Sequence, residues 1–126
     1  MKKLYLAITS ITLSLMGVIF TFAPNRYLAG FGASISEPSL LNVIRSFGGF
    51  YLGFAAFLLV AFRKENLIEG AVLSTTLIMC AVLVGRAISL FVDGLPDPKL
   101  WVSLVIELIF AAWGFGLVLK NKESQP

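Results

Sequence analysis

Three ionisable side chains lie within stretches of sequence that are otherwise long and apolar: Arg45, Arg86 and Glu107. An ionisable group near the middle of a membrane helix costs at least ~2.5–3.5 kcal/mol, so its presence there points to a function or a specific partner. The guanidinium of arginine is a planar donor fork that suits carboxylate or phosphate groups. A membrane carboxylate can pair with arginine or exchange protons. These residues therefore predict a polar site inside an apolar protein.

Polar side chains recur at helical spacing beside each charge: Asn42 with Arg45, Ser89 and Asp93 with Arg86, and Ser103 with Glu107. Residues three or four apart share one face of a helix, and in membrane proteins polar or small residues gather on faces that meet other helices. Gly49 and Gly53 continue the face of Arg45 and predict close approach of another helix there. We expect all the polar side chains above to line one ligand-binding pocket.

The composition predicts a membrane protein. Of the 126 residues, 58% are hydrophobic and only 13% are charged, whereas a soluble domain has about a quarter charged residues. The chain is therefore too poor in polar residues to cover a surface in water. The net charge of +3 does not indicate nucleic-acid binding, because the basic residues lie mostly at the ends of apolar segments.

Four segments are long enough to cross a bilayer, which takes about 20 apolar residues. They cover residues 4–23, 40–62, 67–92 and 100–119. We predict an all-α fold, an antiparallel four-helix bundle that forms a single transmembrane domain over residues 1–126. The first segment resembles a signal peptide, but Pro24 follows the possible cleavage site at Ala23, so we expect it to be retained as a helix.

The segment boundaries carry recognisable helix signals. Ser39 is expected to cap the second helix, and Asn66 with Glu69 resembles a capping box that opens the third. Asp97 followed by Pro98 predicts a cap and a first-turn proline for the fourth. The longer segment between the first two spans contains aromatic residues and is expected to lie along the membrane interface as a short helix or anchoring loop.

Basic residues predict the orientation. One side of the membrane would carry most of them: Lys2, Lys3, Arg63, Lys64, Lys120 and Lys122. The other would carry only Arg26 and Lys99, so both termini should be cytoplasmic. The three buried charges then lie about five to seven residues from the outer helix ends, which is ~8–11 Å at ~1.5 Å per residue.

The chain lacks the residues that several kinds of functional site require. The chain has no histidine and one cysteine, Cys80, which excludes an intrachain disulfide and sites that need histidine ligands. No phosphate-binding loop, nucleophile elbow or metal-ligand spacing is present. We therefore predict no catalytic residue, no cofactor and no metal.

Three interpretations of the polar cluster remain open. Glu107 could pair with one arginine as a structural contact, leaving the other arginine to Asp93 or backbone carbonyls. Alternatively, two arginines against one carboxylate leave a positive charge that binds an anionic lipid, an anionic amphiphile or a partner helix. Glu107 could also exchange protons in a small transporter, which would form a homo-oligomer, although two nearby arginines oppose this. A membrane-embedded lipid enzyme would have only Glu107 and Asp93 as acid or base.

The motifs also carry a family resemblance. The pattern Arg45-x-x-Gly48-Gly49-x-Tyr51-x-Gly53, then Gly85-Arg86-x-x-Ser89-x-x-x-Asp93-Gly94, then Glu107 resembles small bacterial membrane proteins classed as domain of unknown function 4345. The likeness covers nearly the whole chain, and the first motif more distantly resembles DoxX-type four-helix proteins. It implies a multi-pass four-helix protein of the bacterial inner membrane, and it implies no activity. Without a cysteine pair or histidine, a thiol-redox or quinone–haem role does not carry over. We expect a non-enzymatic accessory or lipid-associated factor.

Overall fold

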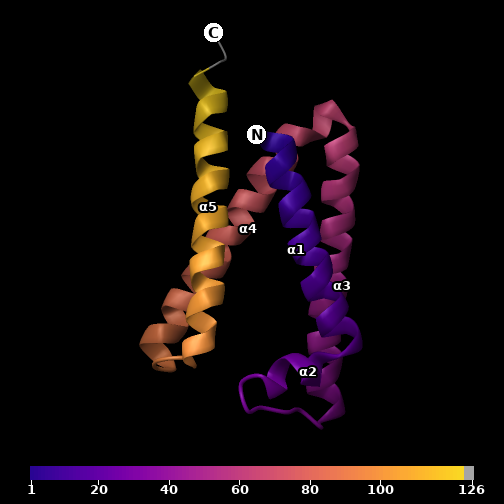
Figure 1. Cartoon of the computed structure of the whole chain (residues 1–126), viewed down its shortest axis with the longest axis vertical. Coiled ribbons are helices and arrows are strands. Elements are labelled where there is room, and N and C mark those ends of the chain that lie inside the picture. The colour runs from indigo at the N-terminus through magenta and orange to yellow at the C-terminus, as the bar shows by residue number, and fades with distance from the viewer. Residues whose placement is uncertain (124–126) are drawn as a thin grey trace. The chain divides into compact units, whose positions relative to one another are not determined.

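The structure, a computed structural model, describes residues 1–123 and is built from α-helices (Figure 1). The elements in chain order are α1 (Lys2–Phe22), α2 (Pro24–Ala29), α3 (Pro38–Arg63), α4 (Glu65–Val92) and α5 (Pro98–Glu123). Side chains are described as far as residue 120. The predicted all-α class is confirmed.

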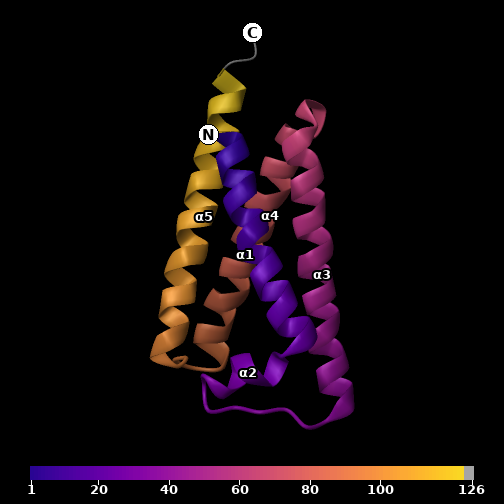
Figure 2. The ribbon, with the colours of Figure 1, turned by 45° about the vertical axis from the view of Figure 1, so that its right-hand side comes forward.

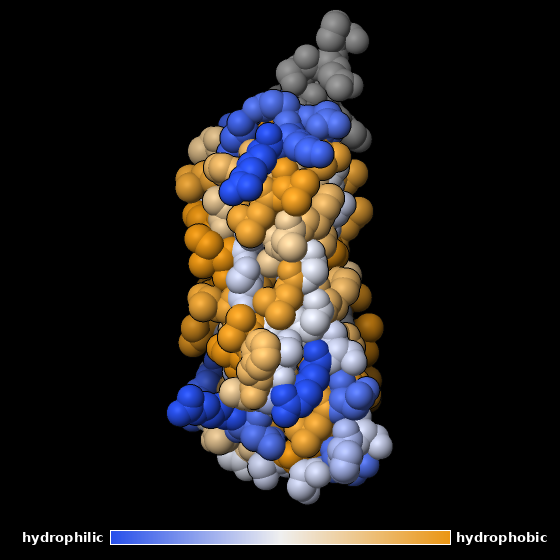
Figure 3. All heavy atoms as spheres, turned by 90° about the vertical axis from the view of Figure 1, so that its right-hand side faces the viewer, coloured by the Kyte–Doolittle hydropathy of each residue, from blue (hydrophilic) through white to orange (hydrophobic). Residues whose placement is uncertain are grey.

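Four of these helices, α1, α3, α4 and α5, are long and apolar enough to cross a membrane. Many large hydrophobic side chains on them are exposed, including Phe91 at 91% and Ile11 at 61%. In Figure 3 hydrophobic residues cover most of the face shown, and hydrophilic residues gather near its two ends. Exposed apolar surface of this extent is typical of a protein that contacts lipid. The chain is therefore a multi-pass membrane protein.

Two of the predicted helix starts are wrong by a few residues. Helix α3 begins at Pro38, so Ser39 lies inside its first turn, and the Leu40 amide donates to Glu37 Oε2 at 2.8 Å. Proline suits a first helical position because it has no N–H to leave unpaired. Glu37, not Ser39, therefore caps α3.

Helix α4 begins at Glu65, and the residue before it, Lys64, is extended and makes no side-chain cap. The expected capping box of Asn66 and Glu69 is therefore wrong, because α3 runs to Arg63 and leaves only one residue between the two helices. The start of α5 is as predicted: the Lys99 amide donates to Asp97 Oδ1 at 2.9 Å, and Pro98 opens the helix.

The chain divides into two compact units. The first, here called the α1–α3 unit, covers Leu6–Arg63. The second, here called the α4–α5 unit, combines Met1–Tyr5 with the residues from Lys64 onward. The bundle predicted over residues 1–126 stays a prediction.

In the α1–α3 unit, α1 and α3 lie side by side (Figures 1 and 2). Gly17 and Gly48 let the two backbones approach closely: a Cβ on Gly17 would lie 2.7 Å from Leu52 Cγ, and one on Gly48 would lie 2.6 Å from the Thr21 nitrogen. Gly49 and Gly53 have no atoms within 4 Å of such a Cβ. The glycine of α3 that allows close approach to α1 is therefore Gly48, one residue before Gly49.

The connection from α1 to α3 contains α2, which confirms that a short helix lies in this segment. The Asn25 side chain donates to the Ile35 carbonyl and accepts from its amide, both at 2.8 Å. Tyr27 packs edge-on against Phe20 of α1, with ring centroids 5.0 Å apart. These contacts hold the connection against the end of α1.

In the α4–α5 unit, the two long helices run in opposite directions, so that Arg86 lies opposite Glu107 and Thr76 opposite Gly114. Lys2 pairs with Glu69 and Lys3 with Glu65, which places the first turn of α1 beside the start of α4.

Tyr5 of the same turn is fully buried, and its ring packs edge-on against Trp113 with centroids 5.3 Å apart. Gly114 lets α5 approach both neighbours, because a Cβ there would clash with Thr76 Oγ1 of α4 and would lie 2.5 Å from the Tyr5 hydroxyl oxygen of α1.

Candidate functional site

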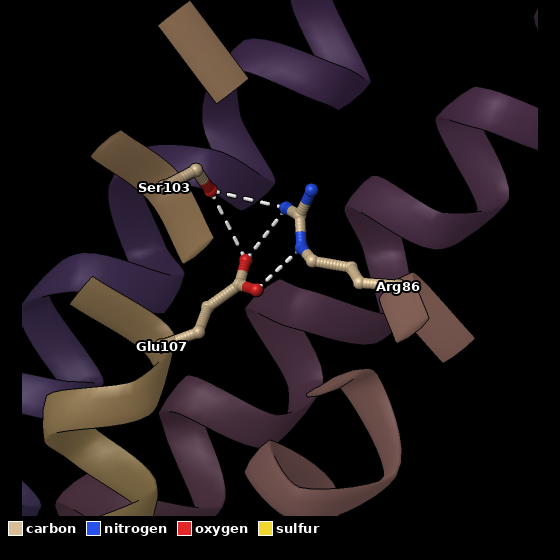
Figure 4. Close-up of polar contacts among 3 residues, drawn as sticks. All are labelled: Arg86, Ser103 and Glu107. Atoms are coloured by element: carbon tan, nitrogen blue, oxygen red, sulfur yellow. Dashed lines mark hydrogen bonds and ion pairs between the residues drawn. The ribbon is translucent and has the colours of Figure 1, made fainter. Parts of the chain in front are cut away.

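The clearest polar cluster is formed by Arg86 of α4 with Ser103 and Glu107 of α5 (Figure 4). Arg86 Nε donates to Glu107 Oε2 at 2.5 Å, and Nη2 donates to Oε1 at 2.7 Å. The same Nη2 donates to Ser103 Oγ at 3.0 Å, and that hydroxyl donates to Oε1 at 3.1 Å. Both oxygens of the Glu107 carboxylate therefore accept hydrogen bonds within this cluster.

Helix geometry explains why these three residues meet. Ser103 and Glu107 are four residues apart on α5, so they share a face. Arg86 lies six residues before the end of α4 and Glu107 nine residues after the start of α5, which is ~9 and ~14 Å at ~1.5 Å per residue. The long arginine side chain spans the remaining offset.

This cluster is electrically neutral and only partly exposed. The side chains of Arg86 and Glu107 are 30% and 18% exposed. A bidentate guanidinium–carboxylate pair is among the strongest polar contacts in proteins. Its evident chemical role is to fasten α4 to α5.

Ser89 and Asp93 form a second polar contact on the same face of α4. Ser89 Oγ donates to Asp93 Oδ2 at 2.7 Å, and both residues are exposed. The pair adds one negative charge near the end of α4. The α4–α5 unit therefore does not have the surplus of positive charge at this end that two arginines against one carboxylate would give.

Arg45 belongs to the other unit, where its Nη1 donates to the backbone carbonyl of Thr21. Thr21 lies in the last turn of α1, whose carbonyls have no partner further along the helix. Arg45 is exposed, and the single carboxylate between Leu6 and Arg63 is that of Glu37, which caps α3. Within its unit, Arg45 therefore makes no ion pair.

Asn42, the remaining predicted site residue, is exposed on α3 three residues before Arg45. Its backbone carbonyl accepts from Ser46 Oγ at 2.9 Å. Asn42, Ser46 and the apolar residues Val43, Phe47 and Phe50 line a shallow pocket of about 350 Å³ along α3. This face thus combines polar and aromatic side chains.

Of the predicted site residues, the structure brings together Arg86, Ser103 and Glu107, and separately Ser89 with Asp93. It pairs Arg45 with the backbone carbonyl of Thr21, which agrees with the alternative that the second arginine bonds a backbone carbonyl, although the sequence did not identify Thr21 as that residue. A signal was present in the sequence, since α1 ends and α3 begins at the two ends of one connection, so the last carbonyls of α1 lie at the end of the unit where Arg45 lies. A common role of all the predicted site residues in binding a ligand stays a prediction.

Among the described residues, no group of three or more His, Cys, Asp or Glu side chains could hold a metal ion. No curated protein and no solved structure was found that matches the chain. Residues 1–118 match a family described as domain of unknown function (DUF4345). Because this match covers nearly the whole length, the chain belongs to the DUF4345 family of domains of unknown function.

Proposed function

We propose that this protein is a non-enzymatic, multi-pass protein of the bacterial inner membrane that binds an anionic amphiphile through Arg45. The proposed arrangement is an antiparallel four-helix bundle with cytoplasmic termini, which puts the Pro38 end of α3 in the outer leaflet. The ligand is a lipid or lipid-like molecule with a phosphate or carboxylate head. Arg86 and Glu107 hold α4 and α5 together and do not form the anion site.

The observation that carries this proposal is the division of charges between the two arginines. Glu107 gives both carboxylate oxygens to Arg86, while Arg45 bonds only a backbone carbonyl in its unit. A guanidinium in hydrocarbon without a carboxylate is expensive. An anionic head group would supply the missing charge and would accept two parallel hydrogen bonds from the same fork.

The surroundings of Arg45 suit an amphiphile in two further respects. The Thr21 carbonyl holds one amino group of the guanidinium, which restricts the side chain before a ligand arrives. Asn42, which is exposed three residues before Arg45, lies close to the same face of α3 and offers the head group a polar contact.

A proton-coupled transporter based on Glu107 has less support. Its carboxylate would have to release Arg86 and Ser103 each time it took up a proton. An alternative to lipid binding is a contact of the exposed face of α3 with a second copy of the chain or with a partner helix, which would fill the pocket along α3. Such a partner would cover Asn42 and Phe47 without needing the charge of Arg45.

The experiment is native mass spectrometry of the purified protein with phosphatidylglycerol, which is anionic, and phosphatidylcholine, which is zwitterionic. Arg45→Ala is expected to weaken phosphatidylglycerol binding about tenfold, the size of a lost charge-assisted contact of ~1.4 kcal/mol. Arg45→Lys should keep part of the affinity, because it keeps the charge and loses the fork.

The matched control is Arg63→Ala, which removes one positive charge from the opposite end of the same helix. It should leave phosphatidylglycerol binding within about twofold of the wild type if affinity follows the site and not total charge. Equal losses for Arg45→Ala and Arg63→Ala, or no loss for either, would contradict the proposal.

A further inference from the structure

A small pocket lies beside the Arg86–Glu107 pair, entirely within the α4–α5 unit. Its volume is about 90 Å³, and it opens where the turn between α4 and α5 meets the two helices. Five of its lining residues are apolar: Leu90, Pro96, Leu100, Trp101 and Leu104. Arg86 and Ser89 supply its polar wall.

The electrostatics of this wall disfavour an anion. The charge of Arg86 is already balanced by Glu107, and Ser89 donates its proton to the Asp93 carboxylate. An entering anion would therefore find a neutralised guanidinium in the wall and two carboxylates directly behind it, each bonded to a lining residue. Because the Ser89 hydroxyl is spent as a donor, its oxygen faces a ligand as an acceptor. The wall thus suits an uncharged group that donates a hydrogen bond.

The size of the pocket further restricts the class of ligand that fits. About 90 Å³ is below the ~150 Å³ of a cavity that holds benzene. A ring or a glycerophosphate head does not fit, but the hydroxyl end of a linear chain and its first methylenes do. Trp101 lines the pocket and is 42% exposed, and we expect the rest of the chain to leave past its ring.

We propose that the pocket between α4 and α5 binds the hydroxyl end of a neutral long-chain amphiphile. Ser89 Oγ accepts the ligand's hydroxyl proton, and Leu90, Leu100 and Leu104 surround the first methylenes. This site is independent of the anion site at Arg45 in its residues, its unit and its ligand charge.

The test follows the indole N–H resonance of Trp101 by NMR in the full chain, reconstituted in lipid nanodiscs. The probes are hexadecan-1-ol, its methyl ether and ionised hexadecanoate. The alcohol should shift the Trp101 resonance saturably, and the ether should bind about fivefold more weakly because it lacks the donor. The Trp113 resonance is the internal control and should not move, because that ring packs against Tyr5.

Two variants separate binding in the pocket from partition into lipid. Leu104→Phe fills the pocket and should abolish the Trp101 shift, whereas Leu108→Phe, one turn further on an exposed position, should preserve it. Ser89→Ala keeps the space, removes the acceptor and should bring alcohol and ether to equal affinity.

Several results would overturn the proposal. The first is a Trp101 resonance that shows no saturable shift with the alcohol, which would mean that the pocket holds water only. The second is a hexadecanoate shift equal to that of the alcohol. The third is an alcohol shift in Leu104→Phe equal to that of the wild type. Arg45→Ala should not alter the Trp101 response. Failure of the anion site would therefore be distinguishable from failure of this one.

Discussion

Among single residues, the contact between Arg86 and Glu107 has the geometry of an ion pair that affects the free energy of unfolding. Exposed pairs such as Lys3–Glu65, whose side chains are 49% and 80% exposed, contribute ~0–1 kcal/mol because water screens them. The Arg86–Glu107 pair is bidentate and far less exposed. Removing one partner there leaves an uncompensated charge, which is much costlier than losing a surface contact.

Glu107→Ala is therefore expected to lower the free energy of unfolding by about 2–3 kcal/mol, somewhat below the range for fully buried pairs. The measurement is reversible unfolding in mixed micelles followed by helical circular dichroism. The double replacement Arg86→Met with Glu107→Leu should recover most of the loss, since it removes both charges together.

Glu65→Ala serves as the control for this pair, because Glu65 is an acidic residue of the same unit with an exposed partner. It should change the unfolding free energy by less than ~1 kcal/mol. If Glu65→Ala and Glu107→Ala cost the same, the Arg86–Glu107 pair is not the fastening contact between α4 and α5.

At the scale of helices, two adjacent glycines of α3 have opposite roles. Gly48 faces α1, where a Cβ would meet the Thr21 backbone nitrogen at 2.6 Å, and backbone cannot move aside as a side chain can. Gly49 faces open space. The contrast isolates helix packing from the helix propensity of glycine, since both residues lie in the same turn.

Gly48→Ala is expected to destabilise the protein by about 1–3 kcal/mol through overpacking. Gly49→Ala should be neutral or stabilising by up to ~1 kcal/mol, because alanine favours helix more than glycine does. Unfolding of both variants in mixed micelles measures the difference. A larger loss for Gly49→Ala would mean that the residue is covered by a helix in the membrane.

The Glu37 cap of α3 gives a prediction in pH. The Leu40 amide, and then that of Ser39, donate to the carboxylate and lower the pKa of Glu37 below its ordinary value. Its contribution to the helix start is therefore complete above the usual glutamate range and is lost as the pH falls through the lowered folded pKa. Hydrogen-exchange protection of the Leu40 amide should fall over that window.

In Glu37→Gln the side chain does not titrate, so protection of Leu40 should no longer depend on pH. The Lys99 amide, which donates to Asp97 Oδ1, is a second cap within the same protein and should be unaffected by this variant. An unchanged pH profile in Glu37→Gln would show that Glu37 does not hold the start of α3.

The helices were predictable from sequence because length and apolar content alone determine them. All four predicted spans lie within helices that the structure confirms, apart from the last residue of the first, since α1 ends at Phe22. The starts of α3 and α4 were less predictable, because several polar residues stood near each boundary and a proline or a one-residue connection decided between them. At the start of α5, by contrast, Asp97 stands directly before Pro98 and no other polar residue competed with it as the predicted cap.

At the scale of the whole molecule, sequence identified the residues that carry charge in apolar helices but could not assign their partners. Arg45 and Arg86 lie at similar depth in their helices, and nothing in their own spacing shows which one meets Glu107. The choice depends on the packing of α5 against α4, which Ser103 and Gly114 favour through contacts distant in sequence. Membership of the DUF4345 family, a domain of unknown function, assigns no activity to these residues.

Because Glu107 pairs with Arg86, we propose that Arg45 takes its counter-charge from a lipid phosphate. Solid-state NMR of protein with ¹⁵N-labelled arginine in phosphatidylglycerol bilayers tests this through the dephasing of guanidinium nitrogens by lipid phosphorus. We predict that Arg45→Lys removes a short-range part of this dephasing and that Arg86→Lys leaves it unchanged. Survival of the short-range part in Arg45→Lys, or its loss in Arg86→Lys, would contradict this assignment of the two arginines.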